Sequence, residues 1–218
     1  MQLAAAVGAL MAGVPDVGAT LYSAVITSTP PGLSGPAILA FDYVDGGSPD
    51  NTVVLDALGG NWVPAPTPAT PSDLPAGAIC GADPTCSPPW TFAESAPPNS
   101  FYELQVPFSA IGTALSFSFT TTDNAPDAGS FPDSFSFFIL DPATGFPLFP
   151  TDDPGGALFS VSIAGTGPCG DSLCVFPPDP SIDGFSITVT PVAPAPEPGS
   201  IALLGAGFIA LFVRRRMR

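Results

Sequence analysis

The sequence predicts an all-β protein: an antiparallel β-sandwich, jelly-roll-like, with a short hydrophobic helix near the C-terminus. The first observation is alternation, because apolar and polar residues follow one another in many short runs. The second is that Gly, Pro and Asp separate these runs, as in turns between strands. The third is composition: 45% of the 218 residues are hydrophobic and 11% are charged, with 30 prolines and 23 glycines. Such a chain is apolar enough to build a folded core.

The alternating runs extend over residues 20–190, which we expect to form one body. In LSFSFTTT, the side chains of Leu115, Phe117 and Phe119 share one face of a strand, and Ser and Thr share the other. Similar runs are FYELQVPF, FSVSIAG and FSITVT, and further candidates are LYSAVIT, AILAFDYV and NTVVLDAL. Strict alternation indicates antiparallel sheet with one buried face. The denser run DSFSFFIL indicates a more central strand.

Residues 62–98 differ from the rest of the body, since they contain ten prolines. Proline cannot donate to a sheet ladder, so we expect a long surface excursion instead of interior strands. Trp62 and Trp90 lie near its two ends. They could present aromatic faces to a sugar ring, or they could pack the excursion onto the sandwich.

Four cysteines fall into two local pairs, Cys80 with Cys86 and Cys169 with Cys174. An even number of cysteines in an exported chain indicates disulfides. Three connectivities are possible, and we favour the two local pairs. A zinc site would need four convergent thiolates, which this spacing does not indicate.

Residues 1–19 are expected to be a signal peptide. An apolar run at residues 3–14 precedes Val17, Gly18 and Ala19, which form a small-residue cleavage pattern. The positive segment that usually opens a signal peptide is missing, so the true start lies upstream or the signal is weak. The alternative is a buried N-terminal helix.

The C-terminal end contains every basic side chain of the protein, namely Arg214, Arg215, Arg216 and Arg218. They follow an apolar stretch at 201–213, which is about 20 Å long as a helix and shorter than a hydrocarbon core of about 30 Å. Residues 191–200 form a Pro-rich linker before it. Because positive residues stay in the cytoplasm, we expect a transmembrane helix at 201–213, a cytoplasmic cluster at 214–218 and an external body.

The linker contains Pro196, Glu197 and Pro198, and this motif, the apolar helix and the arginine cluster follow one another in order. This order resembles the PEP-CTERM sorting tail of Gram-negative bacterial surface proteins. The resemblance implies an exosortase as partner, which would process the tail near the motif. It also implies a precursor tethered transiently to the inner membrane and a product at the cell surface or outside the cell. The alternative is a plain C-terminal anchor.

A second resemblance concerns the body. The segments SFSFF (134–138), Leu140-Asp141-Pro142 and GFPLF (145–149) are similar to a pattern shared by a group of PEP-CTERM proteins. This resemblance implies kinship and no particular chemistry.

Several chemistries are excluded by missing side chains. The chain has no His and no Lys, and residues 1–213 have no Arg. Catalytic triads, His-bearing zinc sites, Schiff bases and phosphate clamps therefore have no residues to build them. An acidic body is also repelled by nucleic acid. We expect no enzyme activity, no catalytic residue, no metal, no cofactor and no nucleic-acid partner.

Two chemistries survive this elimination. A glycosidase needs only two carboxylates, and the body offers Glu94, Glu103 and its aspartates. A structural calcium ion needs clustered loop oxygens. The candidates for calcium are Asp123, Asn124 and Asp127 in one loop, and Asp152 and Asp153 in another. Turn formation is the alternative explanation for both loops.

Taken together, these observations favour an exported surface or extracellular-matrix protein with a structural or interaction role in biofilm. Its anionic body could associate with exopolysaccharide through bridging divalent cations. Two alternatives remain. A carbohydrate-binding module would expose Trp62 or Trp90, and a glycosidase would place two carboxylates across a cleft.

Overall fold

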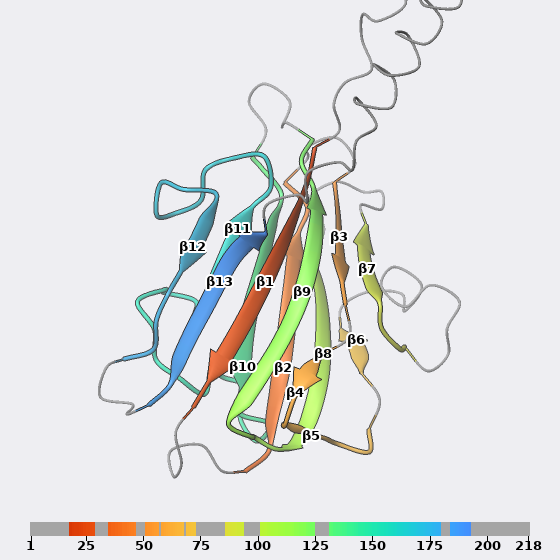
Figure 1. Cartoon of the computed structure of the whole chain (residues 1–218), viewed down its shortest axis with the longest axis vertical. Helices are drawn as coiled ribbons and strands as arrows, with labels where there is room; N and C mark the ends of the chain where they lie inside the picture. The colour runs from red at the N-terminus through yellow and green to blue at the C-terminus, as the bar shows by residue number, and fades with distance from the viewer. Residues whose placement is uncertain are drawn as a thin grey trace, which may run out of the picture.

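A computed structural model describes residues 18–28, 35–46, 51–56, 58–67, 69–72, 86–93, 101–124, 131–179 and 184–192. These residues form two antiparallel sheets and contain no helix (Figure 1). The prediction of an all-β protein is confirmed. The expected signal peptide, linker, helix and arginine cluster lie almost wholly outside the described residues.

Sheet I has the strand order β13-β1-β9-β3-β7, with β4 paired to β9. Its strands are β1 (Ala19–Thr27), β3 (Thr52–Leu55), β4 (Gly59–Gly60), β7 (Trp90–Ala93), β9 (Ala114–Thr122) and β13 (Ser186–Val192). Sheet II has the order β12-β11-β10-β2-β8-β5, with β6 paired to β8. Its strands are β2 (Ala37–Val44), β5 (Val63–Pro64), β6 (Thr70–Ser72), β8 (Phe101–Ala110), β10 (Ser134–Leu140), β11 (Phe159–Ser162) and β12 (Leu173–Val175).

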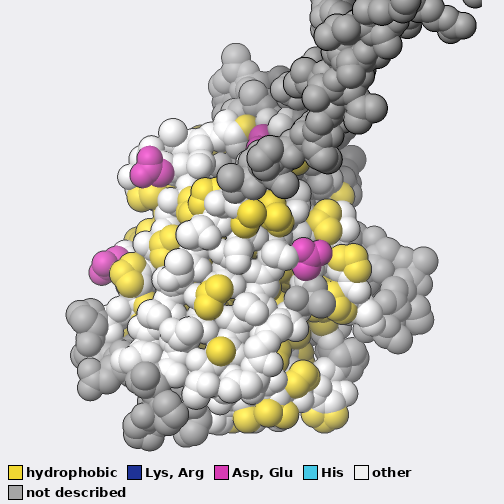
Figure 2. Space-filling model, viewed as in Figure 1, with side chains coloured by type: hydrophobic (Ala, Val, Ile, Leu, Met, Phe, Trp, Pro, Cys, Tyr) yellow, Lys and Arg dark blue, Asp and Glu magenta, His cyan; other side chains and the backbone are white. Residues whose placement is uncertain are grey.

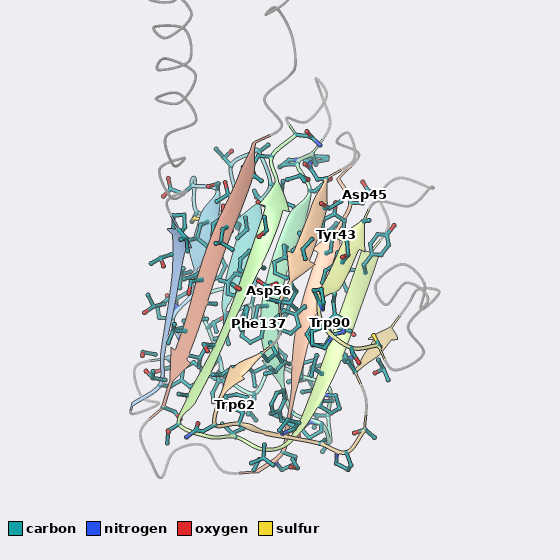
Figure 3. All side chains as sticks on the ribbon, turned by 45° about the vertical axis from the view of Figure 1, so that its right-hand side comes forward. Tyr43, Asp45, Asp56, Trp62, Trp90 and Phe137 are labelled. Carbon is teal, nitrogen blue, oxygen red and sulfur yellow. A yellow bond between two sulfur atoms is a disulfide. The ribbon has the colours of Figure 1, made fainter. Side chains whose placement is uncertain are left out.

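The two sheets face each other across one phenylalanine-rich core. Phe117 of sheet I lies edge-on to Phe41 of sheet II, with ring centroids 5.3 Å apart. Phe119 stacks on Phe159 of sheet II at 5.6 Å, and these separations are typical of favourable aromatic pairs. Phe137 is fully buried and lies between the sheets (Figure 3). Burial of these rings is the main source of stability, at about 1.5–3 kcal/mol per side chain.

Each run that the alternation predicted as a strand forms one. In β9 the predicted inward residues Leu115, Phe117 and Phe119 are buried. β10 has neighbours on both sides, so the expectation of a central strand is confirmed. Successive strands change sheet repeatedly, from β1 to β2 to β3 and from β7 to β10. Crossings of this kind occur in jelly rolls, and the jelly-roll assignment itself stays a prediction.

The proline-rich segment differs from the expected loop, because its described part contributes strands β5, β6 and β7. β7 is the last strand of sheet I, and β5 and β6 both pair with the outer side of β8. Proline is tolerated at such edges, where one side of the strand needs no ladder donor. The sequence pattern therefore excluded interior strands correctly and missed the edge strands.

The body begins and ends slightly beyond the expected limits of 20 and 190. β1 starts at Ala19, which pairs with Thr122, and β13 continues to Val192. The carbonyl of Gly18 also accepts a hydrogen bond from the backbone N–H of Asp123, at 2.9 Å. The expected signal-peptide boundary after Ala19 thus falls inside the first strand.

The loop after β10 contains the segments Leu140-Asp141-Pro142 and GFPLF (145–149), and its contacts give these residues structural roles. Asp141 accepts hydrogen bonds from the Ala143 N–H at 2.9 Å and the Thr144 hydroxyl at 3.0 Å. Gly145 has a φ of +71°, which favours glycine. Phe149 packs on Phe185 with centroids 4.5 Å apart. These residues therefore shape a turn and anchor it to the core.

Candidate functional site

The sorting motif residues Pro196, Glu197 and Pro198 lie outside the described residues, and so do Arg214, Arg215, Arg216 and Arg218. The described part shows where the chain leaves the body toward them. β1 and β13 are antiparallel partners, with Leu21 opposite Val192. The start of the first strand and the end of the last strand therefore lie at the same end of the sandwich (Figure 1).

We call this the tail end of the body. It comprises the described residues 18–21, 44–46, 51–53, 101–102, 121–124, 131–135, 161–173 and 190–192, as the strand registers place them. The opposite end contains the turn between β8 and β9 and the loop after β10.

A buried polar network holds the loops of the tail end together. The Tyr43 hydroxyl lies 3.1 Å from both the Asn51 carbonyl and Oδ2 of Asp133. Oδ1 of Asp133 accepts the Gly46 N–H at 2.8 Å. Asn51 accepts the Asn124 N–H at 2.8 Å and donates to the Asn124 carbonyl at 3.1 Å. Tyr43 and Asp45 lie near this end in Figure 3. Because buried polar groups need partners, the network fixes one arrangement of these loops.

The two loops proposed for calcium use their carboxylates within the protein. Asp123 accepts hydrogen bonds from the hydroxyls of Thr20 at 2.7 Å and Thr121 at 3.0 Å. Oδ2 of Asp153 accepts the N–H groups of Gly155 and Ala157, both at 2.9 Å.

The remaining candidate residues of the two loops do not form a cluster of calcium ligands within the described part of the chain. Asp152 is exposed, the Asn124 backbone bonds to Asn51, and Asp127 lies outside the described residues. No group of three or more His, Cys, Asp or Glu side chains that could hold a metal occurs within the described ranges. Turn formation accounts for the contacts of Asp153, whereas Asp123 and Asn124 bond to distant parts of the chain. The expectation of no metal or cofactor stays a prediction.

Cys169 and Cys174 form the expected local disulfide, with Cα atoms 5.7 Å apart. It closes the loop between β11 and β12. Cys86 is also disulfide-bonded, and its expected partner Cys80 lies outside the described residues.

Both tryptophans are buried, with exposed fractions of 7% for Trp62 and 4% for Trp90. The Trp62 ring packs edge-on to Phe108, with centroids 5.6 Å apart. The Trp90 indole N–H donates to the carbonyl of Cys86 at 2.8 Å. Figure 3 shows both indoles against the body. They pack the proline-rich segment onto the sheets and offer no platform for a sugar ring.

Glu103, one of the carboxylate candidates, lies on the outer face of sheet II in a pair that the sequence did not predict. Asp42 of β2 is directly opposite Glu103 of β8, and the two side chains hydrogen-bond to each other. Gln105 donates to Oε1 of Glu103 at 2.6 Å. Burial, followed by the neighbouring charge of Glu103, raises the pKa of Asp42 to about 8. Asp42 therefore holds a proton near neutral pH.

This pair does not match the glycosidase alternative. The two catalytic carboxyls of a glycosidase lie about 5–10 Å apart on either side of the scissile bond. Asp42 and Glu103 are instead in direct hydrogen-bond contact on one face of a sheet. Each run, AFDYV and YELQV, showed an acid at an outward position, but only the strand register brings the two acids together.

No helix within the described ranges is long and apolar enough to cross a membrane, and the stretch at 201–213 is not among them. Comparison with protein families found a PEP-CTERM protein-sorting motif at residues 194–216. Comparison with curated proteins and with solved structures found no match.

This C-terminal signal implies the class of exported, sorted proteins. The chain carries the PEP-CTERM sorting motif, and the match covers Pro196, Glu197 and Pro198 and the arginines at 214–216. The motif implies export as a membrane-anchored precursor. It also implies processing by an exosortase for the cell surface or the extracellular space.

Proposed function

We propose that the processed body is a non-enzymatic structural or interaction protein of the biofilm matrix or cell envelope. It associates with exopolysaccharide through bridging divalent cations. The sorting motif supports the location, and the charge of the body supports the mode of association.

The distribution of charge is the observation that carries this proposal. The chain has 19 Asp and Glu side chains, and its four basic side chains all lie beyond residue 213. Processing near the Pro-Glu-Pro motif would remove every one of those arginines. The remaining body would attract cations strongly, since nothing but its own N-terminal amine would offset the carboxylates.

The carboxylates are scattered on the surface, as the separate magenta groups in Figure 2 show. The exposed residues among them include Asp56, Asp152, Asp171 and Asp179. Carboxylate oxygens are preferred ligands of calcium. Scattered single carboxylates favour many weak bridges to an acidic polymer over one tight site, and weak bridges add up through multivalency.

The two alternatives have less support. A carbohydrate-binding module was expected to expose Trp62 or Trp90, and both are buried. A glycosidase needs two separated carboxyls, and Asp42 and Glu103 are in contact.

The proposal is tested by retention of the processed body on purified, immobilised exopolysaccharide from the native host. We expect retention in calcium and release by a chelator at unchanged ionic strength. A variant with Asp56, Asp152, Asp171 and Asp179 all changed to Asn should be retained at least threefold less. Retention that survives chelation would contradict the proposal, because it would need a direct contact with the sugar.

A further inference from the structure

We infer that the tail end of the body is a lipid-facing surface: while the precursor is tethered, apolar side chains at this end rest on the bilayer. The inference deepens the proposed function, since it rests on the membrane-tethered precursor. It assigns the surface that contacts the membrane and the surface that stays in water.

Exposed large apolar side chains gather at the tail end. We call these five residues the apolar rim: Leu21, Val44, Phe101, Phe131 and Val192. They make up five of the nine exposed large hydrophobic residues in the described part of the chain. Figure 2 shows hydrophobic side chains on the upper part of the body, and further ones along its lower edge. Isolated exposed apolar residues are common, but a set that surrounds one end of a sandwich needs a reason.

The rim encircles the end because its members come from both sheets. Leu21 and Val192 are cross-strand partners on the outer face of sheet I. Val44 and Phe101 are cross-strand partners on the outer face of sheet II. Phe131, with an exposed fraction of 79%, precedes β10 and lies beside Gly46. Because the two pairs point outward on opposite faces, they reach lipid where the tail end enters the headgroup region.

The length of the chain places this end next to the membrane. Only residues 193–200 separate Val192 from the apolar stretch that starts at Ile201. Fully extended, these residues span about 30 Å, and β1 alone extends about 30 Å away from the tail end. The tail end is therefore within reach of the bilayer, whereas the opposite end is a further strand length away.

The side chains on the two broad faces argue against a body that lies flat. Away from the tail end, the outer face of sheet I presents Ser116, Ser118 and Thr120 beside the single exposed apolar residue Val25 of β1. The outer face of sheet II presents the partly exposed side chains of Glu103 and Ser136, which would lose hydration against lipid.

The polar network makes the rim a fixed surface. Asp133 and Asp45 at this end are 0% and 1% exposed, so they present little charge to lipid. Asp133 also holds the Gly46 N–H, and a Cβ at Gly46 would overlap the backbone carbonyls of Phe131 and Pro132. Among the described residues of this end, the exposed acid is Asp171, on the loop after β11. Apolar contact beside acidic side chains favours zwitterionic over anionic lipid.

The test uses the full-length precursor in phosphatidylcholine vesicles, with a nitroxide label at a single introduced cysteine. The cysteines of the described chain are disulfide-bonded and do not compete for the label. Val44→Cys reports the rim, and Phe146→Cys reports the opposite end. Val25→Cys is the matched control, since Val25 and Val44 are both 41% exposed and Val25 lies on the outer face of sheet I, away from the tail end.

We expect accessibility to a water-soluble nickel chelate to fall at least threefold at position 44 on vesicle insertion, and to stay unchanged at 25 and 146. Equal accessibility at 44 and 146 would overturn the inference, and so would protection at 25. Replacing phosphatidylcholine by phosphatidylglycerol should weaken the protection at 44. The assay contains no exosortase and no polysaccharide, so its failure is distinguishable from failure of the proposed function.

Discussion

The contact between Asp42 and Glu103 is expected to make the stability of the fold depend on pH. Oδ1 of Asp42 is buried and has no hydrogen-bond partner within the described residues. Ionising this carboxyl would place a second negative charge beside Glu103 in a poorly hydrated site. The folded protein therefore favours the protonated form of Asp42.

The free energy of unfolding should depend on this proton. The pKa of Asp42 is raised from its usual 3.8 to about 8 in the folded protein. Between these values the folded state binds the extra proton and the unfolded state does not, so stability falls as pH rises, by up to about 1.4 kcal/mol per pH unit. We expect Asp42→Asn to remove most of this slope and to raise stability at pH 7–8, measured by urea unfolding from pH 4 to 8.

The exposed residue Asp152 supplies a control for this experiment. Asp152→Asn should leave the slope of the wild-type protein in place. Parallel stability curves for wild type and Asp42→Asn would show that the pair is not the source of the pH dependence.

At the scale of elements, the sequence was most informative where alternation was strict. β9 and β10 could be predicted with their inward faces, because burial of alternate Phe residues is a local property of a strand. The contact of Asp42 with Glu103 could not be predicted, because it depends on the register between β2 and β8. β5, β6 and β7 were missed because their pairing comes from β8 and β3, far away in the sequence.

Substitutions of two phenylalanines test how much the inward-facing side chains contribute to the free energy of unfolding. Phe137 of β10 is 0% exposed, whereas Phe146 in the following loop is 72% exposed. Phe137→Ala should lower the free energy of unfolding by about 3–5 kcal/mol, because it removes buried area and leaves a cavity. Phe146→Ala should change it by less than about 0.5 kcal/mol. Similar losses for the two variants in urea unfolding would contradict the described core.

At the scale of the whole molecule, the distribution of charge and the sheet topology both distinguish one end of the protein from the rest. The basic residues follow the apolar stretch, and the described body without them is uniformly acidic or neutral. The antiparallel pairing of β1 with β13 brings both ends of the body to one side. Both ends of the described body therefore lie at a single end of the fold, which is the end that we infer to face the membrane. The sorting signal could be predicted from sequence because its three parts are contiguous, whereas the shared end required the sheet topology.

The central claim is that the tail is a processing signal that the mature protein loses. It is tested most directly by the intact mass of the protein recovered from its native host, with cells and medium analysed separately. We predict a mass that lacks residues 1–19 and the tail beyond about Pro196. A mass that still includes Arg218, found only in membranes, would contradict the account, because the tail would then be a permanent anchor.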